Sequence, residues 1–320
     1  MKRRPLRLVA LLAVLALAVA ACGSDNKKDA SGTTNTTAAN KAPTFAAGTT
    51  MATLQQKGKL VVGTKFDQPG FGLKNPTTGK VEGFDVEIAK LMAAGIFGGT
   101  AADAEKKIEF VETVSAVRES SIVDGKVDMV VATYTINDTR KQIVDFAGPY
   151  FVAKQDIMVK KDDTSIKSVK DLNGKKVCSV QGSTSIKNVA LPANAPQADL
   201  SIQFKTYSEC AAALGDGRVQ AVTTDNTILA GLVQQSAGAY KLVGAPFSDE
   251  PYGIGVKKGD EAFRTFLNDR IVKVEKSGDW KKAFDATLGK LDLKAPSPPT
   301  PDRYTAGSTT AATTTTTAKP

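Results

Sequence analysis

The chain has 320 residues, 42% of them hydrophobic, which is enough for two compact lobes with a sizeable core. Four basic residues belong to a leader, so the net charge of +9 falls to 38 basic against 33 acidic residues, with no basic run that indicates nucleic-acid binding. The lack of any histidine excludes Ser-His-Asp and Cys-His catalysis and the commonest transition-metal ligand. We therefore expect a binding protein without metal or cofactor, not an enzyme.

The amino terminus has the parts of a secretory signal. Met1–Arg7 is basic, and Leu6–Ala21 is an apolar stretch of 16 residues, shorter than the roughly 20 that span a bilayer. Residues 19–22, Val-Ala-Ala-Cys, resemble a bacterial lipobox, which implies a signal peptide at 1–21 and lipid attachment to the sulfur of Cys22. The alternative is an ordinary secretory signal followed by an incidental cysteine.

Both flanks of the folded body are predicted to be disordered. Residues 22–50 contain Ser, Asp, Asn, Lys, Thr and Ala with little that can pack, which is typical of a tether. Residues 295–320 are rich in Pro and Thr. The folded body is therefore expected between residues 51 and 294.

The body opens with an alternation of strands and helices. The apolar run at 60–64 predicts the first strand, and Lys65 stands at its carboxyl end. Asp85 is placed to cap the next helix. Residues 116–123 follow as a further predicted helix, with Arg118 early in it and the side chains of Val117 and Val123 facing inward. A solvated lysine and a capping aspartate are the simplest interpretations of these two polar residues.

The next strand ends in a group of polar residues. Residues 129–132 form a short apolar run, followed by the hydroxyls of Thr133 and Thr135. Asn137 can cap a helix whose first turn holds Arg140. Ligands of open α/β sheets bind outside the carboxyl ends of strands, and the planar fork of arginine can grip both oxygens of a carboxylate. The alternative is an ordinary surface helix with an ordinary arginine.

The pattern then starts afresh. A strand at 176–180 leads into a turn with Ser183 and Thr184, whose hydroxyls and backbone amides can seat an anion. A strand at 219–222 leads to Asp225, which is either a helix N-cap or an acceptor for an ammonium group.

Residues 253–256 predict a return strand, and 260–277 and 278–288 predict two closing helices. An alternation that breaks, restarts and resumes indicates two α/β lobes joined by a double crossover, here near 153–157 and 244–251. The expected division assigns residues 51–153 and 250–294 to lobe 1, and residues 154–249 to lobe 2.

Cys178 and Cys210 are the two cysteines left in an exported domain, both in lobe 2. A disulfide is expected in an oxidising compartment and would stabilise the lobe by roughly 3–4 kcal/mol. The alternative is two unrelated buried thiols.

Several stretches together resemble the extracellular solute-binding proteins of family 3, which serve polar amino-acid ABC transporters. Residues 83–88, Gly-Phe-Asp-Val-Glu-Ile, fit the family signature, and residues 63–70, 132–136 and 178–184 are most similar to glutamate-binding lipoproteins of actinobacteria. The similarity covers about residues 55–290. It implies an α/β, two-lobe, type II periplasmic-binding-protein-like fold with a double-crossover hinge. It also implies a monomer, lipid-anchored on the extracellular face of the cytoplasmic membrane, that hands an amino acid to ABC permease subunits.

The resemblance implies a role for each candidate residue around the amino-acid backbone. Arg140 would pair with the ligand α-carboxylate, assisted by Thr135 and by Ser183–Thr184 across the cleft. Thr133 would offer its backbone carbonyl to the α-ammonium group, with Asp225 as its ionic partner.

Further roles concern the ligand side chain. Lys65 and Arg118 would bind a side-chain carboxylate. The family often stacks an aromatic ring on the ligand, for which Phe66, Phe71 and Tyr134 are the candidates here.

Charge counting favours an acidic ligand. Lys65, Arg118 and Arg140 against Asp225 give three positive charges and one negative, which glutamate would balance. Glutamine would leave one desolvated cation unpaired, at a cost of several kcal/mol. We therefore predict glutamate or aspartate over glutamine by roughly 100-fold or more. Asp67 is the residue that can upset this count, because it can neutralise Lys65 and open the site to amides.

Two other functions are compatible with the same lobes. The protein can act as an amino-acid sensor that reports to a membrane signalling partner. It can also be an enzyme, because dehydratases and cell-wall lytic enzymes share the fold, but the lack of histidine and of a strongly apolar setting around any acid disfavours catalysis.

Overall fold

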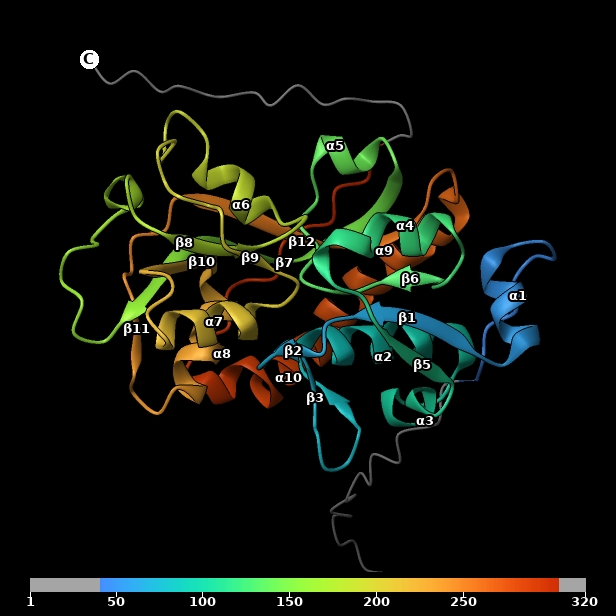
Figure 1. Cartoon of the computed structure of the whole chain (residues 1–320). Coiled ribbons are helices and arrows are strands. Elements are labelled where there is room, and N and C mark those ends of the chain that lie inside the picture. The colour runs from blue at the N-terminus through green and yellow to red at the C-terminus, as the bar shows by residue number, and fades with distance from the viewer. Residues whose placement is uncertain (1–40, 305–320) are drawn as a thin grey trace, which may run out of the picture. The chain divides into compact units, whose positions relative to one another are not determined.

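The computed structural model describes residues 41–304 (Figure 1). The predicted signal peptide at 1–21, the lipidation site Cys22, and most of the predicted tether and tail lie outside these residues. Among the helices of residues 41–304, none combines the length and the apolar character that crossing a membrane requires.

A mixed sheet forms the centre of this part of the chain. Its strands follow the order β5-β1-β6-β12-β7-β10-β8-β9, with β11 also beside β7. Their bounds are β1 Leu60–Thr64, β5 Ile108–Glu112, β6 Met129–Val130, β7 Val144–Lys160, β8 Val177–Val180, β9 Gln203–Phe204, β10 Ala221–Asp225, β11 Tyr240–Leu242 and β12 Ser248–Lys257. A small second sheet contains β2 Asp67–Gln68, β3 Gly72–Lys74 and β4 Val81–Glu82.

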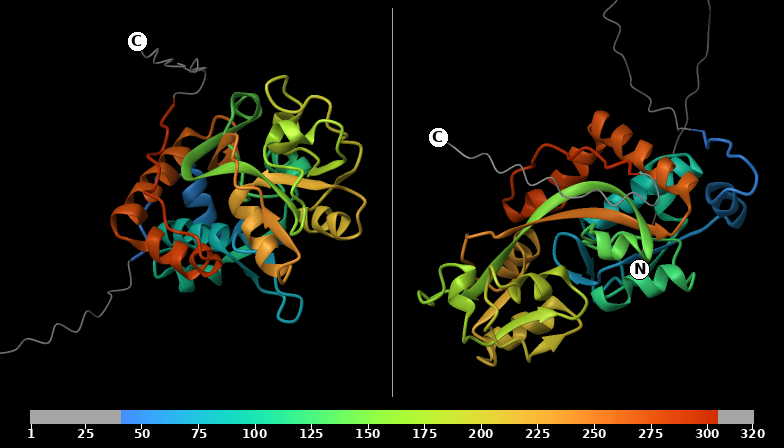
Figure 2. Two further views of the ribbon diagram at one scale, coloured as in Figure 1. Left: turned by 90° about the vertical axis from the view of Figure 1, so that its left-hand side faces the viewer. Right: turned by 90° about the horizontal axis from the view of Figure 1, so that it is seen from above.

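Two long strands connect the lobes. β7 has 17 residues and pairs antiparallel with β12, from the Ser248–Gln155 pair to the Lys257–Val144 pair. The carboxyl-terminal half of β7 also pairs with β10 and β11 of the second lobe. In the right-hand view of Figure 2, the green β7 and the orange β12 run side by side across both lobes. The predicted two-lobe α/β fold is confirmed.

The helices cover the faces of these strands. Their bounds are α1 Thr50–Lys57, α2 Phe84–Phe97, α3 Ala101–Glu105, α4 Arg118–Val123, α5 Asp138–Lys141, α6 Thr184–Val189, α7 Tyr207–Gly215, α8 Asn226–Gln235, α9 Glu261–Lys276 and α10 Asp279–Ala286. Short 3-10 turns lie at Ser115–Val117, Val169–Leu172 and Leu288–Leu291. An aromatic cluster fills the core under α2 and α10, where Phe84 packs edge-on against Trp280 and Phe284.

Two helix predictions are corrected. Gly83 rather than Asp85 occupies the N-cap of α2, and Asp85 lies fully buried in the first turn. Val117 and Val123 are exposed, whereas Arg118 and Ile122 are buried on the inner face. The segment begins as a 3-10 turn, and its helical periodicity therefore starts later than the sequence predicts.

The predicted disulfide is confirmed. Cys178 on β8 and Cys210 on α7 are bonded, with their Cα atoms 5.6 Å apart. The bond ties helix α7 to strand β8, which lies between β10 and β9 in lobe 2.

Packing extends beyond the predicted body at both ends. The ring of Phe45 meets that of Phe266 edge-on, with centroids 5.3 Å apart. The ring of Tyr304 is buried, its hydroxyl accepts a hydrogen bond from the Phe146 amide, and its carbonyl accepts one from Arg264. The sequence predicts disorder from residue 295 onward, but Pro301 and Tyr304 are buried, because the tyrosine ring finds partners on lobe 1. Most of the other residues between 295 and 304 are exposed.

Candidate functional site

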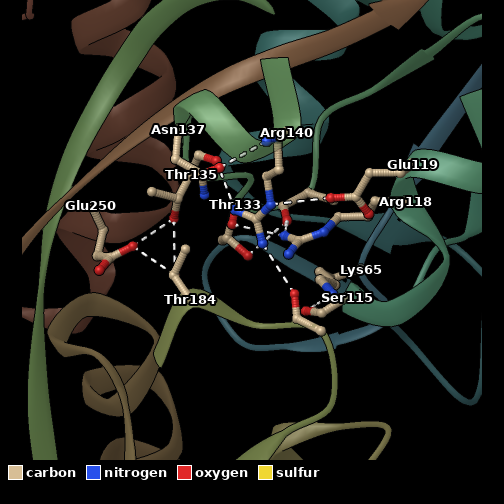
Figure 3. Close-up of polar contacts among 12 residues, drawn as sticks. Lys65, Ser115, Arg118, Glu119, Thr133, Thr135, Asn137, Arg140, Thr184 and Glu250 are labelled. Atoms are coloured by element: carbon tan, nitrogen blue, oxygen red, sulfur yellow. Dashed lines mark hydrogen bonds and ion pairs between the residues drawn. The ribbon is translucent and has the colours of Figure 1, made fainter. Parts of the chain in front are cut away.

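The candidate residues meet between the lobes. Lys65 follows β1, Thr133 and Thr135 follow β6, and Asp225 ends β10. Figure 3 shows several of these side chains, together with Arg118 and Arg140, pointing toward one another. All eight candidates are buried except Thr184, which is half-buried. A cavity of about 500 Å³ is lined by four of them, Thr135, Arg140, Ser183 and Thr184, whereas Lys65, Arg118, Thr133 and Asp225 are not among its lining residues.

Lys65 is a buried basic residue without a carboxylate partner among the described residues. Its Nζ donates to Ser115 Oγ at 2.8 Å, and no carboxylate within residues 41–304 forms an ion pair with it. Burial, and next the charge of Arg118, hold the pKa of Lys65 well below its usual value. A carboxylate brought to this site would favour the charged ammonium again.

Arg118 is the second incompletely paired cation. Its Nη1 donates to the carbonyls of Ala132 and Thr133, both at 3.1 Å, whereas its buried Nε has no partner in the described chain. The guanidinium carbon lies 4.3 Å from the ring centroid of Tyr134. Burial and the neighbouring Arg140 lower the pKa of Arg118 to about 10, so it stays charged at neutral pH.

Thr133 lies in a strained turn that hydrogen bonds to Asp85, Gln68 and Arg118 hold in place. Its φ of 44° is in the left-handed region, which is rare for residues other than glycine. The Thr133 amide donates to the Asp85 carboxylate at 2.8 Å, and its hydroxyl donates to Gln68. Its carbonyl, the predicted acceptor for an α-ammonium group, already accepts a hydrogen bond from Arg118 and has a second lone pair to offer.

Asp85 is a functional-site residue that the sequence analysis missed. Besides the Thr133 amide, its carboxylate accepts a hydrogen bond from the Tyr150 hydroxyl at 2.6 Å. Burial raises the pKa of Asp85 to about 7. The pattern at residues 82–85 offered only a capping interpretation, because the partners of Asp85 lie about 50 and 65 positions away.

The Arg140 guanidinium is held by three partners within the protein. Asn137 caps α5 as predicted, accepting from the Arg140 amide at 2.9 Å. The guanidinium pairs with Glu119 at 3.1 Å and donates to the carbonyls of Thr135 and Gly182, at 2.7 and 3.1 Å. Gly182 belongs to lobe 2, so Arg140 contacts both sides of the cleft.

Asp225 has a buried carboxylate oxygen that accepts no hydrogen bond from the described residues. It occupies the N-cap position of α8, yet its side chain makes no capping bond. The Tyr252 hydroxyl donates to one carboxylate oxygen, and the other, Oδ1, is buried with no partner among the described residues. Burial, and next the charge of Glu250, raise the pKa of Asp225 to about 7. These observations favour an acceptor role over the capping role.

The hydroxyl hydrogens of the other candidates are already committed. Thr135 Oγ1 and Thr184 Oγ1 each donate to Glu250 Oε2 at 2.7 Å. Ser183 Oγ donates to the Val180 carbonyl at 2.8 Å and caps α6 by accepting from the Ile186 amide. The resemblance implies that these three hydroxyls donate to a ligand carboxylate. In this arrangement they cannot, because their hydrogens already point to protein acceptors.

The acids found here make the charge count incomplete. Glu119 pairs with Arg140, while Asp85 and Glu250 are buried nearby. Asp67 forms no ion pair with Lys65, and its carboxylate accepts a hydrogen bond from the Tyr207 amide of lobe 2 at 2.8 Å. Its negative charge nevertheless raises the pKa of Lys65 and so opposes part of the effect of burial. The ligand preference therefore depends on which cations lack an acidic partner, and not on the total charge of the site.

The aromatic candidates occupy different places. Phe71 and Tyr134 are fully buried in the core, and the ring of Tyr134 lies under the Arg118 and Arg140 guanidinium groups. Phe66 is half-buried, with the ammonium of Lys74 5.1 Å from its ring centroid.

Two lobes, a hinge of crossing strands and a buried polar site between them define a binding protein for a small polar ligand. The sequence profile of the bacterial extracellular solute-binding proteins, family 3, matches residues 60–290. The chain belongs to this family.

Individual relatives agree with this assignment. The glutamine-binding protein GlnH of an ABC transporter in Bacillus subtilis is 40% identical over 280 residues, 87% of this chain and 94% of that protein. The glutamate-binding protein GluB of Corynebacterium glutamicum is 40% identical over 243 residues, 73% and 80% of the two chains. The solved structure of an ancestral arginine-binding protein bound to arginine has a TM-score of 0.64 at 38% identity, over 72% of this chain and 98% of that one.

Proposed function

We propose that the protein captures an acidic amino acid, glutamate or aspartate, and delivers it to an ABC importer. The observation that carries the proposal is a buried set of unmatched charges. Lys65 and Arg118 have no carboxylate partner within residues 41–304, and Asp225 Oδ1 has no donor. An amino acid with a side-chain carboxylate and an α-ammonium group supplies what each of them lacks.

The proposed roles follow from this pairing. Lys65 and Arg118 bind the side-chain carboxylate, and Asp225 with the Thr133 carbonyl binds the α-ammonium group. Arg140, whose position Glu119 and two carbonyls fix, binds the α-carboxylate through its remaining N–H groups. The names of the relatives include both glutamine and glutamate binders. The choice of an acid therefore rests on the two incompletely paired cations.

Binding is coupled to closure of two lobes, which we assign to residues 51–153 with 250–294 and to residues 154–249. Contacts that cross between them support this mechanism, among them the Asp67 carboxylate with the Tyr207 amide and the Arg140 guanidinium with the Gly182 carbonyl. A ligand held by Lys65 in one lobe and Asp225 in the other favours the closed form.

We further propose that the protein is a monomer anchored by a lipid on Cys22 at the extracellular face of the cytoplasmic membrane. The lipobox-like residues 19–22 support this, and the family is extracellular. Metabolic labelling with a fatty-acid analogue tests the anchor. Label is expected on the wild-type chain and not on Cys22→Ala, and labelling of both would contradict it.

A thermal-shift screen of the chain from residue 23 onward against the 20 amino acids tests the ligand class. Glutamate and aspartate are expected to raise the melting temperature most, because a ligand that binds only the folded form stabilises it. The largest shift with a basic or an apolar amino acid would contradict the assignment of Lys65 and Arg118.

A further inference from the structure

Glu250 is a buried carboxylate without a charged partner. It lies on β12, one of the two strands that join the lobes, and only 1% of its surface is exposed. No basic side chain of the described residues forms an ion pair with it. Burial of an unpaired charge is costly unless hydrogen bonds replace the lost water.

Four side chains provide that replacement. Oε2 accepts hydrogen bonds from Thr135 and Thr184, both at 2.7 Å, and Oε1 accepts from Asn188 at 2.9 Å and Ser248 at 2.8 Å. Figure 3 shows the hydroxyls of Thr135, above, and Thr184, below, both directed at the Glu250 carboxylate.

These donors come from both lobes. Thr135 follows β6 in the first lobe, Thr184 and Asn188 belong to α6 in the second, and Ser248 shares the connecting strand with Glu250. Because one carboxylate needs donors from both sides, moving the lobes apart removes at least one of its short hydrogen bonds. The stabilisation of Glu250 is thus linked to the distance between the lobes.

We propose that Glu250 is an interlobe latch, a positioning residue that holds the lobes closed through Thr135 and Thr184 even without ligand. The effect of this latch on amino-acid binding rests on the proposed function. The latch raises the population of the closed form, and the apparent affinity for the amino acid rises with that population. It acts through the hydroxyls of Thr135 and Thr184, one from each lobe.

Small-angle X-ray scattering of the ligand-free chain from residue 23 onward tests the latch directly. The variants are Glu250→Gln, whose amide nitrogen cannot accept a hydrogen bond, and Glu250→Ala. The control is Asp249→Asn, since Asp249 is a highly exposed neighbour whose side chain pairs, among the described residues, only with Lys154. Both Glu250 variants are expected to have a larger radius of gyration than wild type, Ala more than Gln, whereas Asp249→Asn leaves it unchanged.

A matching radius for the wild type and both Glu250 variants would overturn the proposal. If Glu250→Ala fails to fold, Thr184→Val removes the lobe-2 hydroxyl without changing side-chain shape. It is expected to expand the ligand-free protein as Glu250→Gln does, and no expansion in either would overturn the latch.

Calorimetry separates this proposal from the proposed function. Glu250→Gln is expected to bind glutamate about tenfold more weakly than wild type, the effect of losing one closure-specific hydrogen bond to a charged group. If wild type binds no acidic amino acid, the proposed function fails, but the ligand-free scattering still decides the latch. Unchanged glutamate affinity together with unchanged scattering would overturn it.

Discussion

The two ends of the polar site differ in how completely their groups are paired. At one end Arg118 Nε and Asp225 Oδ1 are buried without a partner among the described residues, and the Lys65 ammonium has a serine hydroxyl as its partner instead of a carboxylate. At the other end the Arg140 guanidinium and the Glu250 carboxylate meet partners from both lobes. On the basis of this difference we propose that the first end selects the ligand, and that the second holds the closed arrangement in place.

Replacing Arg140 by Ala should have the largest effect, because it removes the α-carboxylate partner and leaves Glu119 without its cation. We expect loss of at least about 1,000-fold in glutamate affinity, as for breaking a buried ion pair. We also expect a lower melting temperature, since the bond to the Gly182 carbonyl is lost. Calorimetry and thermal unfolding measure both.

Lys187→Ala is the matched control for Arg140→Ala. Lys187 is an exposed cation that lines the same cavity, and its side chain forms no hydrogen bond or ion pair within residues 41–304. It should bind like wild type, and an equal loss in both variants would show that the effect is general electrostatics.

Replacing Lys65 by Met tests the selective end. The substitution keeps the length of the side chain and removes the cation, so glutamate affinity should fall about 100-fold while glutamine affinity falls much less. Calorimetry with both ligands measures the ratio. Parallel losses for glutamate and glutamine would place the side-chain carboxylate elsewhere.

Replacing Gly182 by Ala tests the closed end without touching a charge. Gly182 has a φ of 75°, and a Cβ there would lie 2.6 Å from the Cα of Ala116 in the other lobe. Because that overlap exists only when the lobes are closed, we expect roughly 30-fold weaker binding, equivalent to about 2 kcal/mol. Scattering with saturating glutamate should show incomplete closure, and full closure at wild-type affinity would refute this contact.

The dependence on pH should be the smallest effect. Asp225 has a pKa of about 7 instead of 3.8, so it is partly protonated at neutral pH, and the ligand ammonium needs its ionised form. Glutamate affinity should fall as the pH drops below 7, by at most about tenfold per unit. Calorimetry near pH 6.5 in buffers of different ionisation enthalpy should detect proton release on binding. No release would contradict the pairing.

The raised pKa of Asp225 affects folding stability in the opposite direction from ligand binding. A carboxyl whose pKa rises from 3.8 to about 7 on folding is protonated in the folded chain and ionised in the unfolded chain between these values. Its contribution to the unfolding free energy of the ligand-free protein is therefore greatest below about pH 4 and is lost as the pH rises to about 7. Stability and binding should thus respond in opposite directions between pH 4 and 7.

The sequence predicts features that local patterns determine. Asn137 and Arg140 are three positions apart, so the cap and the helix that carries the arginine follow from a short motif. The alternation of apolar runs was sufficient for two lobes, and two cysteines in an exported lobe were sufficient for the disulfide.

Features that depend on distant partners were missed. The donors to Glu250 lie as far as 115 positions away, and no spacing in the chain relates them. Asp85 resembled a cap for the same reason. The attachment of residues 301–304 to lobe 1 depends on Tyr304, whose partners lie on β7 and α9, so composition alone indicated disorder.

Calorimetric titration of the chain from residue 23 onward with glutamate and with glutamine, in the same buffer at pH 7.5, tests the central claim most directly. The unmatched cations Lys65 and Arg118 predict that glutamate binds at least roughly 100-fold more tightly than glutamine. Glutamine binding as tightly as glutamate would contradict the account.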